Sequence, residues 1–349
     1  MGIFFTDISR HSAGVRLAVA AIAALCAFIP SAAQEGRNAY SFLSIPASSR
    51  VYGLGGTNIA VIDDDISLAE QNPALLGPEI GRQAVFSYMH WIGSSNFAGV
   101  RYGQGAGEHG AWSVGLRYLG YGEMAGYDEF GQQTGAFSPS DFVAEGTYAH
   151  DFTYRLRGGI SIKGIYSSYE RYSAFALGAD LGLNYYDEER DMSLSVALKN
   201  MGGQLKRFAD TYDHLPFDIQ LGWMQGIGEG GFSLSVTAWN LTKWNLPYYE
   251  HTEDGVKETV LKSGFAKNLF RHLIFGVQYQ PSDRFYLDLA YNYKTRSDMS
   301  SYSRNFLSGF SVGLGLKVRS FRLGVSYAMP HKSASTILLN LGLDISDLL

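Results

Sequence analysis

The chain has 349 residues, of which 41 are Gly and one is Cys, and its formal net charge at pH 7 is −5. Aromatic residues make up 14% and charged residues 17%, a profile that excludes intrinsic disorder. A lone Cys excludes a disulfide framework and a Cys-based zinc site. The mild negative charge argues against nucleic acid as a partner.

The first 33 residues are expected to form a signal peptide. Arg10 and Arg16 precede the apolar stretch 17–29, and small residues follow up to Ala33, after which we expect cleavage. The only cysteine, Cys26, lies inside this stretch and would be removed with it. Lipidation of Cys26 is the weaker alternative, because a bulky Leu precedes it. No later segment reaches the roughly 18 uncharged apolar residues of a membrane helix.

Residues 34–82 lack the alternation of a strand. Ser67 and Glu70 have the spacing of a capping box, which predicts a short helix from about 68 to 71 that ends at Asn72-Pro73. We expect this segment to fill the lumen of the barrel described next, as a hatch.

From residue 83 onward, apolar and polar residues alternate with a period of two, the pattern of strands with one apolar face. Fourteen strands are predicted: 83–91, 96–102, 110–119, 141–151, 155–168, 174–186, 191–200, 217–225, 231–242, 272–280, 285–294, 308–318, 321–328 and 336–344.

Alternation alone fits both a soluble sandwich and a membrane barrel. Three further observations favour the barrel. Many strands reach about ten residues, the length that crosses a bilayer at a tilt. Aromatic residues lie at the ends of the apolar faces, as Trp112 and Tyr118 do. Connections alternate between short turns and the long loops 120–140, 201–216, 243–271 and 295–307. The sequence therefore predicts an all-β chain whose residues 83–349 form a 14-stranded antiparallel transmembrane barrel.

The face of the strands that points into the lumen is rich in glycine and in charges of both signs. The glycines are expected to leave room for a plug; they are Gly115, Gly178, Gly182, Gly222, Gly276, Gly313 and Gly315. The mixture of charges predicts salt bridges to the plug more than a selective pore; the residues are Arg117, Glu145, Lys163, Asp180, Lys199, Asp218, Asp288, Lys317 and Arg322.

Two short patterns match catalytic motifs, but neither lies in the structural context that its motif needs. Gly105–Gly110 has dinucleotide spacing but joins two strands, and Ser311 has the flanking glycines of a nucleophile elbow but sits within a strand. None of the eight His residues has metal-ligand spacing. We therefore predict no catalytic residue, metal or cofactor, and leave an outer-membrane esterase as the least favoured alternative.

The long loop 243–271 is aromatic-rich. It either folds over the barrel mouth or docks a protein partner, in which case the candidate contacts are Trp244, Tyr248 and Tyr249.

The hatch segment carries the most specific residues of the chain, within 40–50, 53–59, 63–65 and 71–76. Its motif residues are Gly53, Gly55, Gly56, Asn72, Pro73 and Ala74. This segment resembles the start of the PorQ family, outer-membrane proteins of the type IX secretion system, and more distantly the PorV and FadL families. The glycines allow close turns in a crowded lumen. A hatch role and a ligand-gating role both fit, and the first is favoured.

The resemblance implies an anchor in the complex that attaches secreted cargo to the cell surface. Its expected partners are a PorZ-like surface protein, with PorU and PorV nearby, and outer-membrane lipid and lipopolysaccharide. It also implies a periplasmic N-terminus and extracellular long loops. The alternative is a FadL-like transporter of hydrophobic small molecules; polar inward faces favour the anchor. The C-terminal Leu349 departs from the Phe that ends many such barrels.

Overall fold

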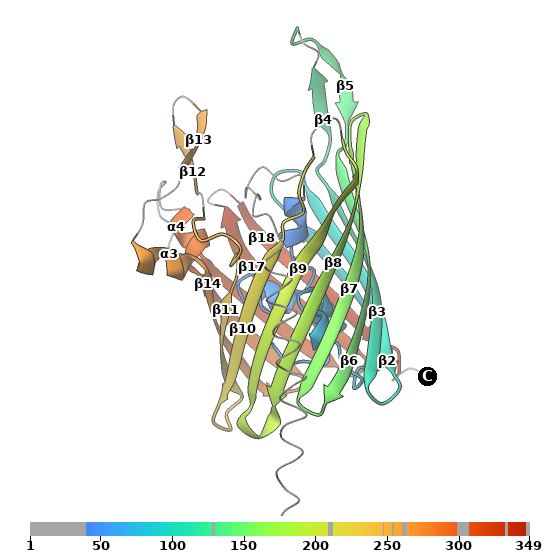
Figure 1. Cartoon of the computed structure of the whole chain (residues 1–349), viewed down its shortest axis with the longest axis vertical. Coiled ribbons are helices and arrows are strands. Elements are labelled where there is room, and N and C mark those ends of the chain that lie inside the picture. Colours follow the sequence, from blue (N-terminus) through green and yellow to red (C-terminus); the bar gives the residue numbers. More distant parts are fainter. Residues whose placement is uncertain are drawn as a thin grey trace, which may run out of the picture. The chain divides into compact units, whose positions relative to one another are not determined.

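The computed structural model describes residues 40–127, 130–208, 212–246, 248–252, 255–259, 264–298, 307–331 and 334–346. Within them, fourteen antiparallel strands close into a barrel, which confirms the predicted fold (Figure 1). In chain order they are β1 (Gln83–His90), β2 (Asn96–Ala106), β3 (Gly110–Gly120), β6 (Ser140–Thr153), β7 (Leu156–Tyr169), β8 (Tyr172–Asp187), β9 (Met192–Lys206), β10 (Asp218–Ile227), β11 (Phe232–Ala238), β14 (Leu273–Ser282), β15 (Phe285–Asn292), β16 (Phe310–Val318), β17 (Phe321–His331) and β18 (Ala334–Asp344).

The barrel closes where β1 pairs with β18, so every one of the fourteen strands has two neighbours. No helix among the described residues is long and apolar enough to span a bilayer. The predicted signal peptide lies outside the described part of the chain.

The outer face of the barrel is apolar. In β16, Val312, Leu314 and Leu316 are exposed, whereas Ser311 between the outward positions is buried. Aromatic residues occupy paired positions near the long-loop ends of the strands: Tyr118 faces Phe142, with ring centroids 4.8 Å apart, and Tyr291 faces Phe310 at 5.0 Å. This upper aromatic girdle above an apolar band is the surface that a membrane barrel presents to lipid.

Strand boundaries differ from the prediction where the chain leaves the wall. β11 ends at Ala238, not at 242, and β15 ends at Asn292 because Tyr293–Asp298 forms helix α4. β9 continues to Lys206 past an irregularity in its pairing with β8, where Asn200 has a φ of 58°.

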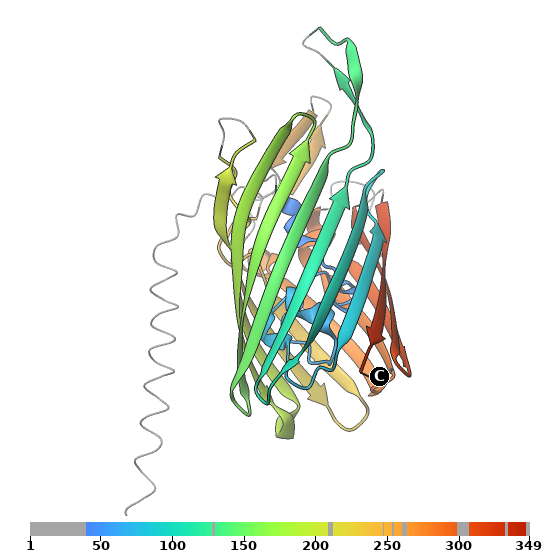
Figure 2. The ribbon, with the colours of Figure 1, turned by 90° about the vertical axis from the view of Figure 1, so that its right-hand side faces the viewer.

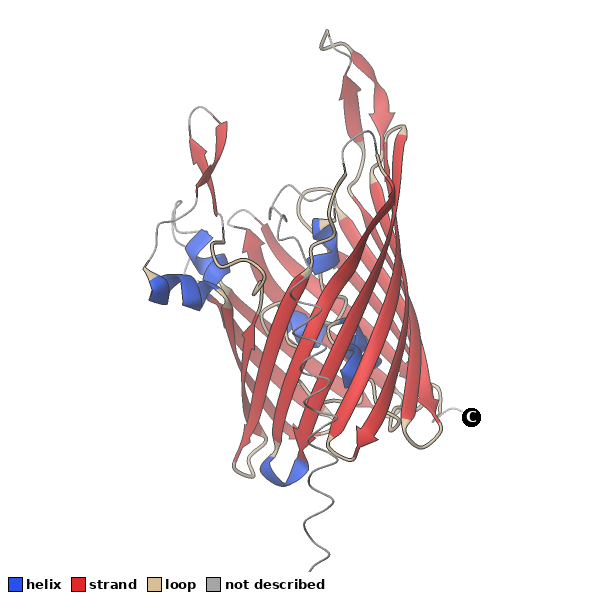
Figure 3. Ribbon diagram, viewed as in Figure 1, coloured by secondary structure: helices blue, strands red, loops and turns tan. Residues whose placement is uncertain are grey.

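Loop lengths separate the two ends of the barrel, as predicted. At one end the strands join by short turns, and at the other end long connections carry structure of their own (Figure 3). That long-loop end holds two hairpins, β4–β5 (Met124–Tyr127 and Gln133–Phe137) and β12–β13 (Tyr248–Thr252 and Gly255–Thr259), and helix α3 (Phe265–Arg271).

Residues 40–82 lie inside the barrel (Figure 2). They form η1 (Ser41–Ser44), α2 (Ser49–Gly53), η2 (Ile66–Glu70) and η3 (Pro73–Leu75). The path starts at Tyr40, which packs against residues near the long-loop end, and reaches β1 at the short-turn end. We call residues 40–82 the hatch.

The short helix predicted in the hatch is present as η2 and ends before Asn72, but the prediction of its cap is wrong. The cap of η2 is Asp65, whose side chain accepts from the backbone N–H of Ser67 at 2.8 Å, so Ser67 is not the cap. Asn72 and Pro73 also begin the next 3-10 helix, η3, because Pro fits the first turn of a helix.

Candidate functional site

Glycines of the wall form grooves for the hatch. A Cβ on Gly53 of α2 would lie 2.6 Å from the Cα of Gly313 in β16, so two backbones touch where neither residue has a side chain. Ser311 donates from its Oγ to the carbonyl of Gly53 at 2.8 Å on the same strand. This contact fixes α2 against the wall.

Other predicted lumen glycines serve the same purpose. A Cβ on Gly182 would meet Asn72 and one on Gly222 would meet Ile59. A Cβ on Gly276 would first meet Ser235 of the wall and then Leu54 of the hatch. Three of the predicted set instead make room for barrel side chains; they are Gly115 beside Arg101, Gly178 beside Leu215 and Gly315 beside Tyr286.

The hatch motif residues lie at turns and contacts. Gly55 and Gly56 have φ values of +95° and +87°, the left-handed region that glycine adopts freely, and they redirect the chain after α2. The Asn72 side chain caps η3 by accepting from the N–H of Ala74 at 3.0 Å and donates to the carbonyl of Ile59 at 3.0 Å. Pro73 packs against Gly159 in β7.

A buried ion pair joins the middle of the hatch to the wall. Glu70 pairs with Arg117 of β3, and both side chains are nearly inaccessible. The second carboxylate oxygen of Glu70 accepts from the N–H of Ala47 at 3.0 Å, and Lys199 donates to the Glu70 carbonyl. Glu70 thus connects two parts of the hatch to two sides of the barrel.

A second ionic contact lies near the short-turn end. Asp64 of the hatch pairs with Arg322 and, at 3.2 Å, with Lys317. Burial opposes ionisation of Asp64, but the hydrogen bonds and charge of Arg322, with the charge of Lys317, overcome it and lower its pKa to about 2. The carboxylate is therefore charged at neutral pH.

The remaining predicted lumen charges mostly pair within the wall. Asp180 lies 2.6 Å from both Lys163 and Lys199, and Glu145 lies 2.6 Å from Arg101. Asp218 accepts from the Leu241 N–H at 3.1 Å, and Asp288 is fully buried beside the hatch groove at Gly313. The predicted salt bridges between hatch and lumen are confirmed.

The sequence predicts mostly polar inward faces, but large apolar side chains gather inside the lumen near the long-loop end. Met89, Phe97, Leu119, Val143 and Ile165 point inward and are buried with hatch residues; the hatch side of this cluster is Tyr40, Phe42, Leu43, Ile45 and Tyr52. The lower lumen is mixed: Val85, Ala111 and Ala149 pack on apolar hatch residues, and Arg322 and Lys317 pair with Asp64. The sequence average of the inward faces concealed the upper cluster.

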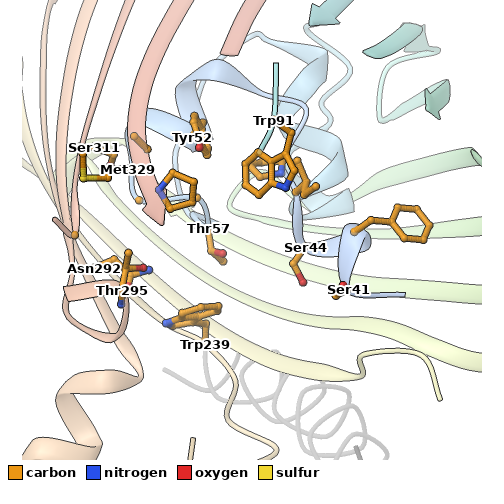
Figure 4. A pocket seen from close by; sticks show the side chains of 18 of the residues that line it. Ser41, Ser44, Tyr52, Thr57, Trp91, Trp239, Asn292, Thr295, Ser311 and Met329 are labelled. Atoms are coloured by element: carbon orange, nitrogen blue, oxygen red, sulfur yellow. Dashed lines mark hydrogen bonds between the residues drawn. The ribbon is translucent and has the colours of Figure 1, made fainter. Parts of the chain in front are cut away.

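An open cavity of about 390 Å³ lies above the hatch at this apolar end (Figure 4). Its floor is hatch residues, among them Phe42, Ile45 and Thr57, and its walls include Trp91 and Trp239. Further lining residues are Tyr52, Leu119, Tyr121, Asn292, Ser311, Ala328, Met329 and Pro330. The indole N–H of Trp239 is buried and has no hydrogen-bond partner among the described residues. Sequence patterns missed this cavity because its residues come from the hatch and six separate wall segments.

No arrangement for catalysis is formed by the described residues. Ser311 Oγ donates to the hatch, so it is not held by a His base. His272 bonds backbone carbonyls of Trp239 and Trp244 at 3.0 and 3.1 Å. No cluster of three or more potential metal ligands occurs in the described part.

Of the three predicted partner-binding residues, only Trp244 has a described side chain. Trp244 is 45% exposed and stacks on His272. Tyr248 and Tyr249 lie in β12, for which the backbone alone is described.

No protein-family model matches the chain, and no curated protein matches it. The fold is similar to that of solved outer-membrane barrels. The Pseudomonas putida toluene transporter TodX superposes with a TM-score of 0.52 at 12% identity, over 85% of this chain and 97% of that one. A TodX variant, described as a monoaromatic hydrocarbon channel, gives 0.50 at 12% identity over 84% and 96%. A Pseudomonas aeruginosa FadL homologue gives 0.50 at 9% identity over 85% and 98%. The chain thus has the FadL-type fold.

Proposed function

We propose that this chain is an integral outer-membrane barrel that binds small hydrophobic molecules at its long-loop mouth for passage across the membrane. The observation that carries the proposal is the apolar cavity of about 390 Å³ above the hatch, a size within the usual range for small-molecule sites. The neighbours of the same fold named as a toluene transporter and a hydrocarbon channel support it. The long loops are proposed to be extracellular, as in other such barrels.

Passage requires the hatch to move or rearrange. Below the cavity, the hatch is held by the Gly53–Gly313 contact and the Glu70–Arg117 pair, which leave the lower lumen filled. The described conformation is therefore a closed, ligand-accepting one. The ligand-gating role of the hatch motif, which the sequence leaves open beside the hatch role, is part of this proposal.

The test is ligand binding by the purified chain in detergent, measured with toluene and with a medium-chain fatty acid as probes. Ala328→Trp fills the cavity from β17, and we expect it to abolish binding of both probes. Tyr327→Trp, the outward neighbour, is the matched control and should bind normally. Equal binding by wild type and Ala328→Trp would contradict the proposal.

A second candidate is anchoring of a PorZ-like surface protein in a type IX attachment complex, with no catalytic role. Its support is the sequence resemblance of residues 40–76 and the hairpin β4–β5, which projects beyond the rim with Tyr127 and Phe130 exposed by 65% and 86% (Figure 1). Detergent extraction of the native complex followed by mass spectrometry tests it. A monomer that carries only a hydrophobic ligand would exclude this anchor role.

A further inference from the structure

Helix α3 has its polar face buried and its apolar face exposed, the reverse of an ordinary surface helix. Its polar residues Asn268 and Arg271 are buried, with 4% and 2% of their surface exposed. Its apolar residues Phe265, Leu269 and Phe270 are exposed by 71%, 38% and 46%. A surface helix of a protein in water normally has the opposite arrangement, so the exposed face of α3 is suited to an apolar medium.

The polar face of α3 is fixed to the barrel rim. Asn268 donates to the carbonyl of Trp244, and Arg271 pairs with Asp298 of α4 at 2.8 Å. His272, directly after the helix, bonds the carbonyls of Trp239 and Trp244. These contacts hold the helix in one orientation, so the outward apolar face is built into the fold and is not the result of a loose loop.

The apolar face of α3 continues the surface that the barrel presents to lipid. The Phe270 ring lies 6.2 Å from Phe275, an outward residue of β14, and 6.0 Å from Tyr293. Phe275 is the register partner of Tyr291, which belongs to the upper aromatic girdle. α3 and α4 pack together at the long-loop end of β14 (Figure 3).

Trp244 extends this face. Its ring lies 5.1 Å from Phe265 and stacks on His272, with 45% of the residue exposed. Lys267, on the same helix, is exposed as well. Aromatic and aliphatic side chains with an adjacent lysine form the composition of a helix that lies in a membrane interface, where the lysine can reach anionic headgroups.

We propose that α3 and Trp244 form a lipid foot, defined as Trp244, Phe265, Lys267, Leu269 and Phe270, which lies in the interface of the bilayer leaflet at the long-loop end. The aromatic side chains of the foot extend the upper aromatic girdle outward from the wall at β14. Its occupant is the phospholipid of that leaflet, not a protein partner. The inference rests on the membrane-spanning part of the proposed function and not on ligand binding.

Depth-dependent quenching in bilayers tests the foot. The chain with Cys26→Ser receives one cysteine, at Phe265→Cys, Leu314→Cys or Phe130→Cys, and each is labelled with an environment-sensitive fluorophore and reconstituted into phosphatidylcholine vesicles. The quenchers are lipids with a nitroxide near the headgroup or deep in the acyl chain, and aqueous iodide. Leu314 is a lipid-facing wall residue of β16, and Phe130 lies at the projecting hairpin β4–β5.

We expect the label at 265 to be quenched more by the shallow nitroxide than by the deep one, and to be protected from iodide. The label at 314 should respond to the acyl-chain nitroxides, and the label at 130 to iodide alone. If 314 responds to lipid while 265 behaves like 130, the foot is overturned and the barrel stands. If 314 does not respond to lipid, both the foot and the membrane-spanning proposal fail.

A charge substitution gives an independent readout. Leu269→Glu should expose the label at 265 to iodide in vesicles, because a carboxylate on the apolar face opposes its burial at the interface. Lys267→Glu should weaken shallow quenching in vesicles with anionic phosphatidylglycerol more than in neutral vesicles. Unchanged iodide access in Leu269→Glu would contradict the lipid foot even if the wild-type quenching followed expectation.

Discussion

The upper and lower parts of the lumen differ in how completely the hatch fills them. The upper part, toward the long loops, gathers aromatic and aliphatic side chains and leaves a cavity of about 390 Å³. The lower part is closed by backbone contacts at glycines, by apolar packing around Val85, and by ion pairs such as Asp64–Arg322. One part leaves an open cavity, and the other holds the chain's own hatch. The difference teaches that the same alternating strands can leave a cavity or form a seal, according to how closely the hatch packs against them.

One of the two largest effects is expected from Gly53→Leu. A side chain there would collide with the backbone of Gly313, and backbone cannot rotate away, so the change should cost at least the roughly 1–3 kcal/mol of ordinary overpacking. The measurement is the thermal midpoint of the heat-sensitive gel shift of the folded barrel in detergent. Gly146→Leu is the matched control, because a Cβ at Gly146 has no atom within 4 Å. Equal midpoints for the two variants would show that the glycine groove does not hold the hatch.

The next effect concerns the buried pair. Arg117→Met leaves Glu70 buried without its partner, and we expect a loss of about 3–5 kcal/mol in unfolding free energy. The double variant Arg117→Met with Glu70→Gln should recover a large part of that loss, because no unpaired charge remains. Denaturant titration of wild type, the single variants Arg117→Met and Glu70→Gln, and the double variant provides a double-mutant cycle. Additive effects of the two substitutions would mean that the residues do not act as a pair.

A smaller effect is expected in the upper part. Trp239→Leu keeps an apolar wall but removes the aromatic ring, so toluene should bind about fivefold more weakly, from a lost ring–ring contact of about 1 kcal/mol. Methylcyclohexane, which has no aromatic ring, is the control ligand and should keep its affinity. Isothermal titration with both ligands makes the comparison. Equal weakening for both would indicate lost packing volume and not a lost aromatic contact.

The smallest effect is the pH dependence of the Asp64 contact. Its pKa is lowered to about 2 by Arg322 and Lys317, so the stabilisation is complete above the pKa of an unfolded Asp and disappears as pH falls through 2. Because Asp64 is 42% exposed and salt screens such pairs, the effect should be modest. Melting curves of wild type and Asp64→Asn should differ at pH 6 and converge near pH 2. If the difference in melting temperature between the two proteins grew toward low pH, the ionised Asp64 carboxylate would not be the stabilising form.

Much of the wall followed from the sequence, because outward and inward residues alternate wherever one face meets lipid. Residues such as Val312 and Leu314 therefore identify β16 without knowledge of its neighbours. Strand ends were less accurate where the chain leaves the barrel, as at Ala238 and Asn292, because a helix or irregular segment competes there with pairing.

The candidate site was only partly predictable. The glycines of the lumen face and the need for a plug followed from composition and spacing, but the match of Gly53 to Gly313 joins residues 260 positions apart in the chain, which no local pattern encodes. The cavity was missed for the same reason. The expectation of mostly polar inward faces gave no sign of the upper apolar cluster, since Met89, Phe97 and Leu119 come from separate strands and gather only when the barrel closes.

The sequence by itself determined the barrel, its fourteen strands, the separation of short turns from long loops, and the presence of a hatch segment. Tertiary structure alone decided which glycine receives which part of the hatch, which carboxylate pairs with which cation, and where in the lumen the cavity opens. The physical reason is the separation along the chain of the residues that interact. Alternation and turn chemistry act between residues close in the chain, whereas closure of the barrel brings together residues whose fit depends on register, and register is fixed only when all fourteen strands pair.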